Sequence, residues 1–76
     1  MDSQTIEQII RDGLPDAEVR VTGDDGVHFD AVVRCAAFAG KPTLQRHRMV
    51  YATLGSLMGQ EIHALALRTE LPETAD

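Results

Sequence analysis

The sequence contains one cysteine, two phenylalanines, one tyrosine and no tryptophan in 76 positions. A lone thiol cannot form an internal disulfide, and it cannot build a zinc site from cysteines. Three aromatic side chains offer little surface on which nucleic-acid bases could stack. These scarcities point away from a disulfide-stapled secreted domain. They indicate a protein of a reducing compartment, and we expect a cytoplasmic location.

Positive charge and long apolar runs are also scarce. Seven Lys and Arg residues face twelve Asp and Glu residues, which gives a formal net charge of −5. General nucleic-acid binders rely on many basic side chains that contact phosphates, so this balance disfavours that class while leaving room for a local basic patch. No segment approaches the roughly 20 apolar residues of a membrane span, and the acidic N-terminal stretch lacks the basic start of a signal peptide. We expect no membrane association.

The first half of the chain predicts one helix and a β-hairpin. Isoleucines recur at helical spacing after Asp2 or Ser3, either of which can cap the helix, and Gly13 and Pro15 end it. Apolar and polar residues then alternate over 17–23 and again over 28–34, as in half-buried strands. The turn "GDDG" between them predicts an antiparallel pair. It matches the G-x-x-G loop of nucleic-acid-binding KH domains only formally, because it joins two strands and carries two acids.

The second half predicts a loop, a longer helix and a last strand. Phe38 should anchor the loop, and the helix from Thr43 should end at Gly59, with a short break early in it also compatible with the sequence. Its apolar stripe comprises Leu44, Val50, Tyr51, Leu54, Leu57 and Met58. The strand covers 62–68, and a polar tail occupies about 70–76 of a single domain, 1–76. The order α-β-β-α-(α)-β predicts an α+β fold, with a three-stranded mixed sheet and helices on one face.

Three histidines are the main candidates for chemistry. His47 lies on or beside the apolar stripe, so a partly buried structural role is favoured. His28 should be accessible at the start of a strand, and His63 begins an apolar strand next to a loop, where a structural role is also favoured. Together His28 and His63 could hold a transition metal or half of an iron–sulfur centre. Because a closed site needs about four ligands, a partner would have to supply the rest.

The other reactive or charged groups have plainer interpretations. Cys35 lacks any recognisable base nearby in the sequence, so a half-buried, inert thiol is favoured over a nucleophile, and we expect no enzyme. The basic cluster consists of Lys41, Arg46 and Arg48. A solvated helix face is favoured for it, and a docking surface for an acidic or phosphorylated partner is the alternative.

The segments "FAGKPTLQRHRMVYATL" and "IHALALRTELP" resemble the BolA family. The family pattern runs Phe-x-Gly-Lys, then Arg-His-Arg with Val-Tyr close behind, then an Ile/Val-His-Ala-Leu strand that ends near Thr and Pro. The matching residues here are Phe38, Gly40, Lys41, Arg46, His47, Arg48, Val50, Tyr51, Ile62, His63, Ala64, Leu65, Thr69 and Pro72. The hairpin "VTGDDGVHFDAVV" also resembles the first two strands of the family, so the resemblance covers nearly the whole chain.

The resemblance implies a class II KH-like fold and a non-enzymatic role in iron–sulfur trafficking or iron regulation. It implies a heterodimer with a monothiol glutaredoxin around a bridged [2Fe–2S] cluster, to which the glutaredoxin and glutathione bring thiolates. His63 matches the family's strand ligand, and His28 is the best match for a second ligand from the hairpin. The alternative is a nucleic-acid-binding transcriptional regulator that uses the basic cluster. A homodimer of the free protein stays open.

Overall fold

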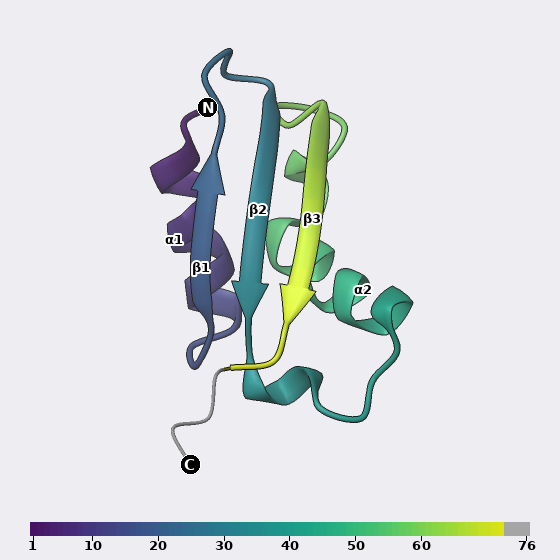
Figure 1. Ribbon diagram of the computed structural model, residues 1–76. Helices are drawn as coiled ribbons and strands as arrows, with labels where there is room; N and C mark the ends of the chain where they lie inside the picture. Colours follow the sequence, from purple (N-terminus) through teal and green to yellow (C-terminus); the bar gives the residue numbers. More distant parts are fainter. Residues whose placement is uncertain (73–76) are drawn as a thin grey trace.

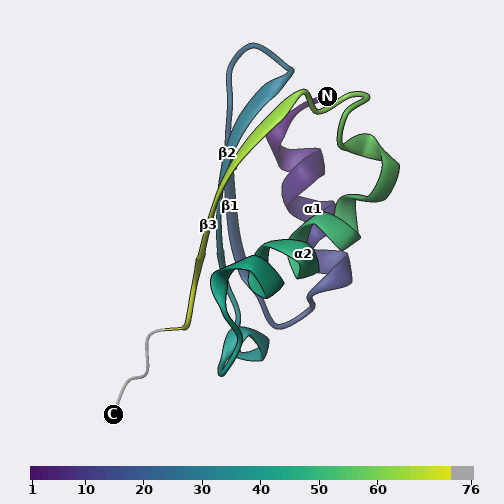
Figure 2. The ribbon, with the colours of Figure 1, turned by 90° about the vertical axis from the view of Figure 1, so that its right-hand side faces the viewer.

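Two helices pack against one face of a three-stranded sheet in the computed structural model, which describes residues 1–72 (Figure 1). The elements are α1 (Ser3–Gly13), β1 (Glu18–Thr22), β2 (His28–Arg34), η1 (Ala36–Phe38), α2 (Thr43–Leu54), η2 (Gly55–Leu57) and β3 (Ala64–Glu70), where η denotes a short 3-10 turn. Figure 2 shows both helices on the same side of the sheet and the other side left open. The predicted α+β, KH-like order is confirmed.

The sheet has the order β1-β2-β3 and mixes two kinds of pairing. β1 and β2 are antiparallel, with Val19 opposite Val33, as the hairpin predicts. β3 returns through α2 and pairs parallel with β2, with His28 opposite Ala64. Parallel strands begin at the same end of a sheet, so the first residues of β2 and β3 lie side by side.

The core lies between the sheet and the helices. Strand residues alternate between this interior and the open face, which gives β2 its pattern of exposed and buried positions. The buried residues are Ile6, Ile10, Val19, Val21, Phe29, Ala31, Val33, Cys35, Phe38, Val50, Leu54, Ile62 and Leu65. Phe38 has no exposed surface, so its predicted role as the anchor of its loop is confirmed.

The second helix is shorter than predicted. It ends at Leu54 because Gly55 takes a positive φ of 56°. The backbone N–H of Gly55 donates to the carbonyl oxygen of Tyr51 and so caps the end of the helix. The chain continues as η2 rather than as helix up to Gly59. The break therefore lies late in this segment, at Gly55, and not early in it as the sequence also allowed.

The stripe predicted along this helix is wrong at Leu44, which is 62% exposed. Val50, which is buried, lies six positions further along the helix, and at about 100° per residue that places the two side chains about 120° apart around the helix axis. The first turn of α2 also extends sideways beyond β3 in Figure 1. Leu44 consequently has no layer of the fold to pack against.

The last strand lies two residues further along the chain than predicted. Ile62 is buried and forms only an isolated bridge with Met58, while Thr69 and Glu70 belong to β3. Glu70, the last residue of β3, is held in the sheet through Arg34 and Cys35, so the tail predicted from about residue 70 follows this strand. The remainder of that predicted tail, 73–76, lies outside the described residues. Within 1–72, neither helix has the length and apolar character that crossing a membrane requires.

Candidate functional site

His28 and His63 meet at one end of the sheet. His28 is the first residue of β2, and His63 directly precedes β3. Because His28 pairs with Ala64, the two imidazole rings come within 6.4 Å of each other, centroid to centroid, in an edge-to-face arrangement at 84°. The structure thus brings together the two histidines that the sequence singled out, although 34 residues separate them in the chain.

The backbone fixes the position of His63 relative to the hairpin. The N–H groups of His63 and Ala64 both donate to the carbonyl oxygen of Val27, at 2.9 and 3.3 Å. Directly before them, the buried Ile62 donates its N–H to Leu57 and ties the segment to η2. The loop that carries His63 is therefore held both by the core and by the residue next to His28.

A carboxylate that the sequence interpretation missed organises the hairpin loop. Asp25 Oδ1 accepts hydrogen bonds from the backbone N–H groups of Val27 and His28, at 2.9 and 2.8 Å. Its Oδ2 lies 2.7 Å from His28 Nδ1. The backbone N–H groups of Val27 and His28, followed by the His28 side chain, lower the pKa of Asp25 well below its usual value. The available signal was an aspartate three residues before a candidate ligand in a Gly-rich turn.

Both histidines are open to solvent. The His28 side chain is 62% exposed, and His63 is exposed as well. No group of three or more metal-binding side chains occurs in the described part of the chain. Metal–imidazole bonds are about 2 Å long. The exposed His63 side chain can turn toward the His28 ring, which contacts Asp25, without disturbing the core. The pair can therefore supply two nitrogen ligands to a metal.

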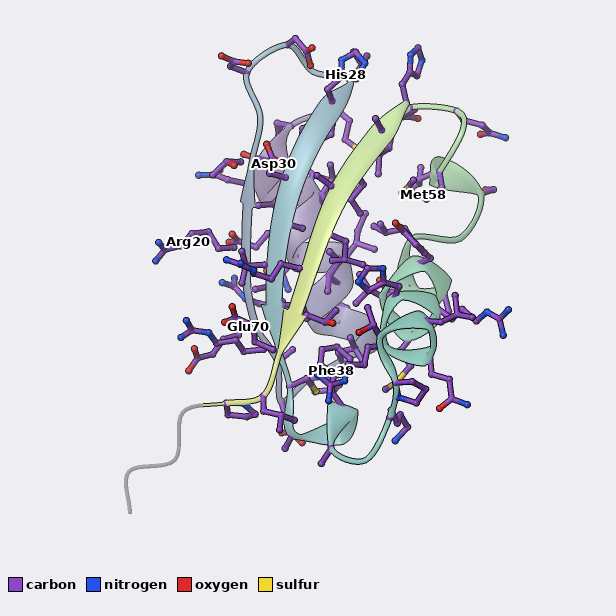
Figure 3. The ribbon with its side chains drawn as sticks, turned by 45° about the vertical axis from the view of Figure 1, so that its right-hand side comes forward. Arg20, His28, Asp30, Phe38, Met58 and Glu70 are labelled. Atoms are coloured by element: carbon purple, nitrogen blue, oxygen red, sulfur yellow. The ribbon has the colours of Figure 1, made fainter. Side chains whose placement is uncertain are left out.

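The basic cluster lies elsewhere. Lys41 Nζ donates to the carbonyl oxygen of Ala37, and the half-buried Arg46 donates from Nε to the carbonyl oxygen of Lys41, both at 2.8 Å. These two cations brace the loop before α2, whereas Arg48 is exposed on α2. In Figure 3, Phe38 of the same loop lies at the opposite end of the molecule from His28. The structure does not join the basic cluster to the histidine pair.

The remaining two candidates have structural roles. His47 is half-buried, and its ring contacts that of Tyr51 edge-on at 6.3 Å, as its place beside the apolar stripe predicts. Cys35 is only 2% exposed, so the prediction of a half-buried thiol is wrong. Its N–H donates to Glu70 and its side chain continues the inward alternation of β2, which places the sulfur in the core.

A hollow on the described surface lies away from both sites. It has a volume of about 260 Å³ and opens on the uncovered face of the sheet, between Arg20, Val32 and Arg34. Arg34, one of the lining residues, is paired with Glu70 at 2.7 Å. This shallow, ion-paired surface contains no arrangement of acid, base and nucleophile, and the histidine pair remains the best candidate site.

Known proteins share this chain's sequence pattern and its fold. A family model described as BolA-like protein matches residues 5–74. The solved structure of a BolA protein homologue from Coxiella burnetii superimposes with a TM-score of 0.85 and is 46% identical, over 95% of this chain and 92% of that one. The BolA domain of SufE1 from Arabidopsis thaliana has a TM-score of 0.77 and is 27% identical, over 92% and 91% of the two chains.

One curated relative has a name that states a function. The DNA-binding transcriptional regulator BolA of Escherichia coli K12 is 45% identical over 42 residues. The aligned segment spans 55% of this chain and 40% of that protein.

Proposed function

Because this chain belongs to the BolA family, we propose that it is a non-enzymatic accessory protein that binds a monothiol glutaredoxin and shares a bridged [2Fe–2S] cluster with it. His63 and His28 would be its ligands. The observation that carries the proposal is their placement: two exposed imidazoles 6.4 Å apart at the end of a rigid sheet.

The incomplete ligand set supports a shared site. Two histidines supply half of the roughly four ligands that a closed metal site takes, and no group of three side chains that could hold a metal ion occurs within residues 1–72. The thiolates would come from the glutaredoxin and glutathione. Imidazole ligands raise the reduction potential of a [2Fe–2S] centre relative to thiolates alone. The cluster shared with this protein would therefore have a higher reduction potential than the cluster bound by thiolates only.

The occurrence of the domain in a larger protein also supports an accessory role. An alignment with SufE-like protein 1 of Arabidopsis thaliana covers 66% of this chain and only 14% of that protein. A BolA domain can therefore work as a module beside other domains. This agrees with a protein whose described residues include two candidate ligands, His28 and His63, and no group of three metal-binding side chains.

A titration tests the proposal. A monothiol glutaredoxin loaded with its glutathione-ligated cluster is mixed with increasing amounts of this protein, and visible absorption and circular dichroism are recorded. We expect the spectrum to change and to saturate at one protein per cluster. His63→Ala should abolish the change, because one of two ligands on this side is lost.

His47→Gln is the matched control for that titration. It also removes an imidazole, but from a half-buried position against Tyr51, and should leave the spectral change intact. A spectrum that stays the same on adding the wild-type protein, or a full change with His63→Ala, would overturn the proposal.

A second candidate function is nucleic-acid binding, favoured by the name of the Escherichia coli relative. The exposed Arg48, with Lys41 and Arg46 before it, would contact phosphates. A gel-shift titration at physiological salt tests this, with Arg48→Gln expected to weaken binding because one phosphate contact is lost. Absence of a shift at physiological salt would count against this function.

A further inference from the structure

We infer that Asp25 is a positioning residue that holds the His28 ring in the tautomer with the proton on Nδ1, so that Nε2 presents its lone pair outward as the ligand atom. The use of Nε2 as a cluster ligand rests on the proposed function. The tautomer itself is a property of this chain alone. Testing the two separately distinguishes a failure of one from a failure of the other.

The contact between the two side chains sets the proton's place. Asp25 Oδ2 lies 2.7 Å from His28 Nδ1. A carboxylate can only accept, so Nδ1 must donate, and in a neutral imidazole the other nitrogen then carries no proton. Metal-binding histidines are oriented by the same kind of contact from the far side of the ring. Free histidine in water favours the tautomer with the proton on Nε2, so Asp25 would reverse that preference in His28.

The rest of the loop makes Asp25 a fixed acceptor. Its Oδ1 is held by the backbone N–H groups of Val27 and His28, so the carboxylate is anchored independently of the ring. Gly23 lets the turn pack closely on β2. A Cβ there would lie 2.6 Å from the His28 carbonyl oxygen and 2.6 Å from the Phe29 ring. The backbone thus fixes both partners of the contact between Asp25 and His28.

His63 has no comparable orienting contact. Its ring has no polar partner in 1–72, and its ring contact is the edge-on approach to His28. The two candidate ligands therefore differ: the His28 ring is held in one orientation, while the His63 side chain can turn. A fixed ligand beside an adjustable one would let this protein accept a cluster that arrives already bound to its partner.

The test uses Asp25→Asn with Asp24→Asn as the matched control. The asparagine retains an oxygen for the two backbone N–H groups, but its amide nitrogen donates and cannot accept a proton from Nδ1. Asp24→Asn removes the same charge from the neighbouring residue, which makes no hydrogen bond to His28 in the described structure. Both variants thus preserve the loop, and only the first removes the orienting contact.

The first readout is the tautomer in the free protein. Long-range ¹H–¹⁵N correlation spectra at about pH 8, where a histidine with an ordinary pKa is neutral, report which ring nitrogen carries the proton. We expect the Nδ1–H form of His28 in the wild type and in Asp24→Asn, and the Nε2–H form in Asp25→Asn. A wild-type His28 in the Nε2–H form, or an unchanged tautomer in Asp25→Asn, would overturn the inference.

The second readout is the cluster titration with the loaded glutaredoxin. Losing an orienting partner typically lowers metal affinity about 10- to 100-fold, so Asp25→Asn should shift the midpoint by that factor while Asp24→Asn should not shift it. Wild-type affinity in Asp25→Asn would overturn the positioning role and leave the proposed function standing. An Asp25-dependent tautomer with no spectral response from the wild type would instead overturn the proposed function.

Discussion

His63 donates its backbone N–H to the carbonyl oxygen of Val27 at 2.9 Å. This bond links the start of β3 to the residue before β2. It continues the parallel pairing of the two strands by one step, up to the residues that carry the candidate ligands. The spacing of His28 and His63 is therefore a property of the sheet rather than of two independent loops. Changes that disturb the start of β2 should disturb both histidines.

Gly23→Ala should displace the start of β2. The added Cβ would lie 2.6 Å from the His28 carbonyl oxygen, and the backbone there cannot move without moving the strand. We expect a loss of about 1–3 kcal/mol in the free energy of unfolding, as for overpacked sites. Urea denaturation measures that loss, and amide chemical shifts should change at His28 and His63 together. An unchanged amide chemical shift at His63 would contradict the coupling between the start of β2 and the start of β3.

Phe38→Ala should be strongly destabilising. Phe38 is completely buried and anchors η1 to the core. Deleting a buried phenylalanine costs about 3–5 kcal/mol, which is a large share of the stability of a 76-residue protein. Urea denaturation should show the loss directly.

Leu44→Ala provides the matched control, because it also truncates a large apolar side chain but at a position that is 62% exposed. We expect a change within about 0.5 kcal/mol, as at ordinary surface sites. Similar losses for the two variants would contradict the placement of Leu44 outside the core.

The residue pattern predicted the layers of the fold well, because the alternation in β1 and β2 has a period of two and leaves little freedom in which face is buried. The residue pattern predicted burial and helix length wrongly in α2, where they depend on the position of a residue on the helix and on where the helix ends. Leu44 has the right residue type for the core, but its side chain points about 120° around the helix from the buried Val50. The first turn of α2 also extends beyond β3 (Figure 1). Gly55 ends the helix through its backbone conformation, which the apolar spacing does not encode.

The histidine pair was predictable in identity but not in geometry. No local sequence spacing links His28 to His63, and their proximity follows from the parallel register of β2 and β3. Asp25 was overlooked because the turn "GDDG" has an adequate explanation as a hairpin connection. The fold brings one of the two acids of this turn, Asp25, against the candidate ligand His28.

The outer edge of β1 is closed by side chains of α1. Glu7 accepts the Val21 N–H at 3.1 Å, Arg11 donates to the Val19 carbonyl oxygen at 3.3 Å, and the two side chains are 3.2 Å apart. Glu7→Ala should remove about 0.5–1.5 kcal/mol of stability, the usual net value of a hydrogen bond. It should also speed amide hydrogen exchange at Val21.

Gln8→Ala is the control for that exchange experiment. It lies on the same helix, but its side chain bonds only to the exposed Asp12. It should leave the exchange of Val21 unchanged. Equal rates of amide exchange at Val21 in Glu7→Ala and in the wild type would show that the edge of β1 does not depend on the hydrogen bond from Val21 to Glu7.

The Asp25 carboxyl should stay ionised at pH values where an ordinary aspartate is protonated. Its pKa is lowered by the N–H groups of Val27 and His28 and by the His28 side chain. A carboxyl whose pKa is lower in the folded than in the unfolded state stabilises the fold above the unfolded value of about 3.9. That contribution is lost as the pH falls from there toward the folded pKa. The loop should therefore hold its structure through neutral and mildly acidic pH and loosen only below about pH 4.

Carboxyl ¹³C chemical shifts recorded between about pH 6 and pH 2 test this directly, because an ordinary aspartate changes its shift with a midpoint near 3.9 in that range. The Asp25 resonance should remain at its ionised position well below that midpoint. A midpoint near 4 would mean that the three hydrogen bonds to Asp25 do not persist in solution. It would remove the structural basis for the orientation of His28 at the same time.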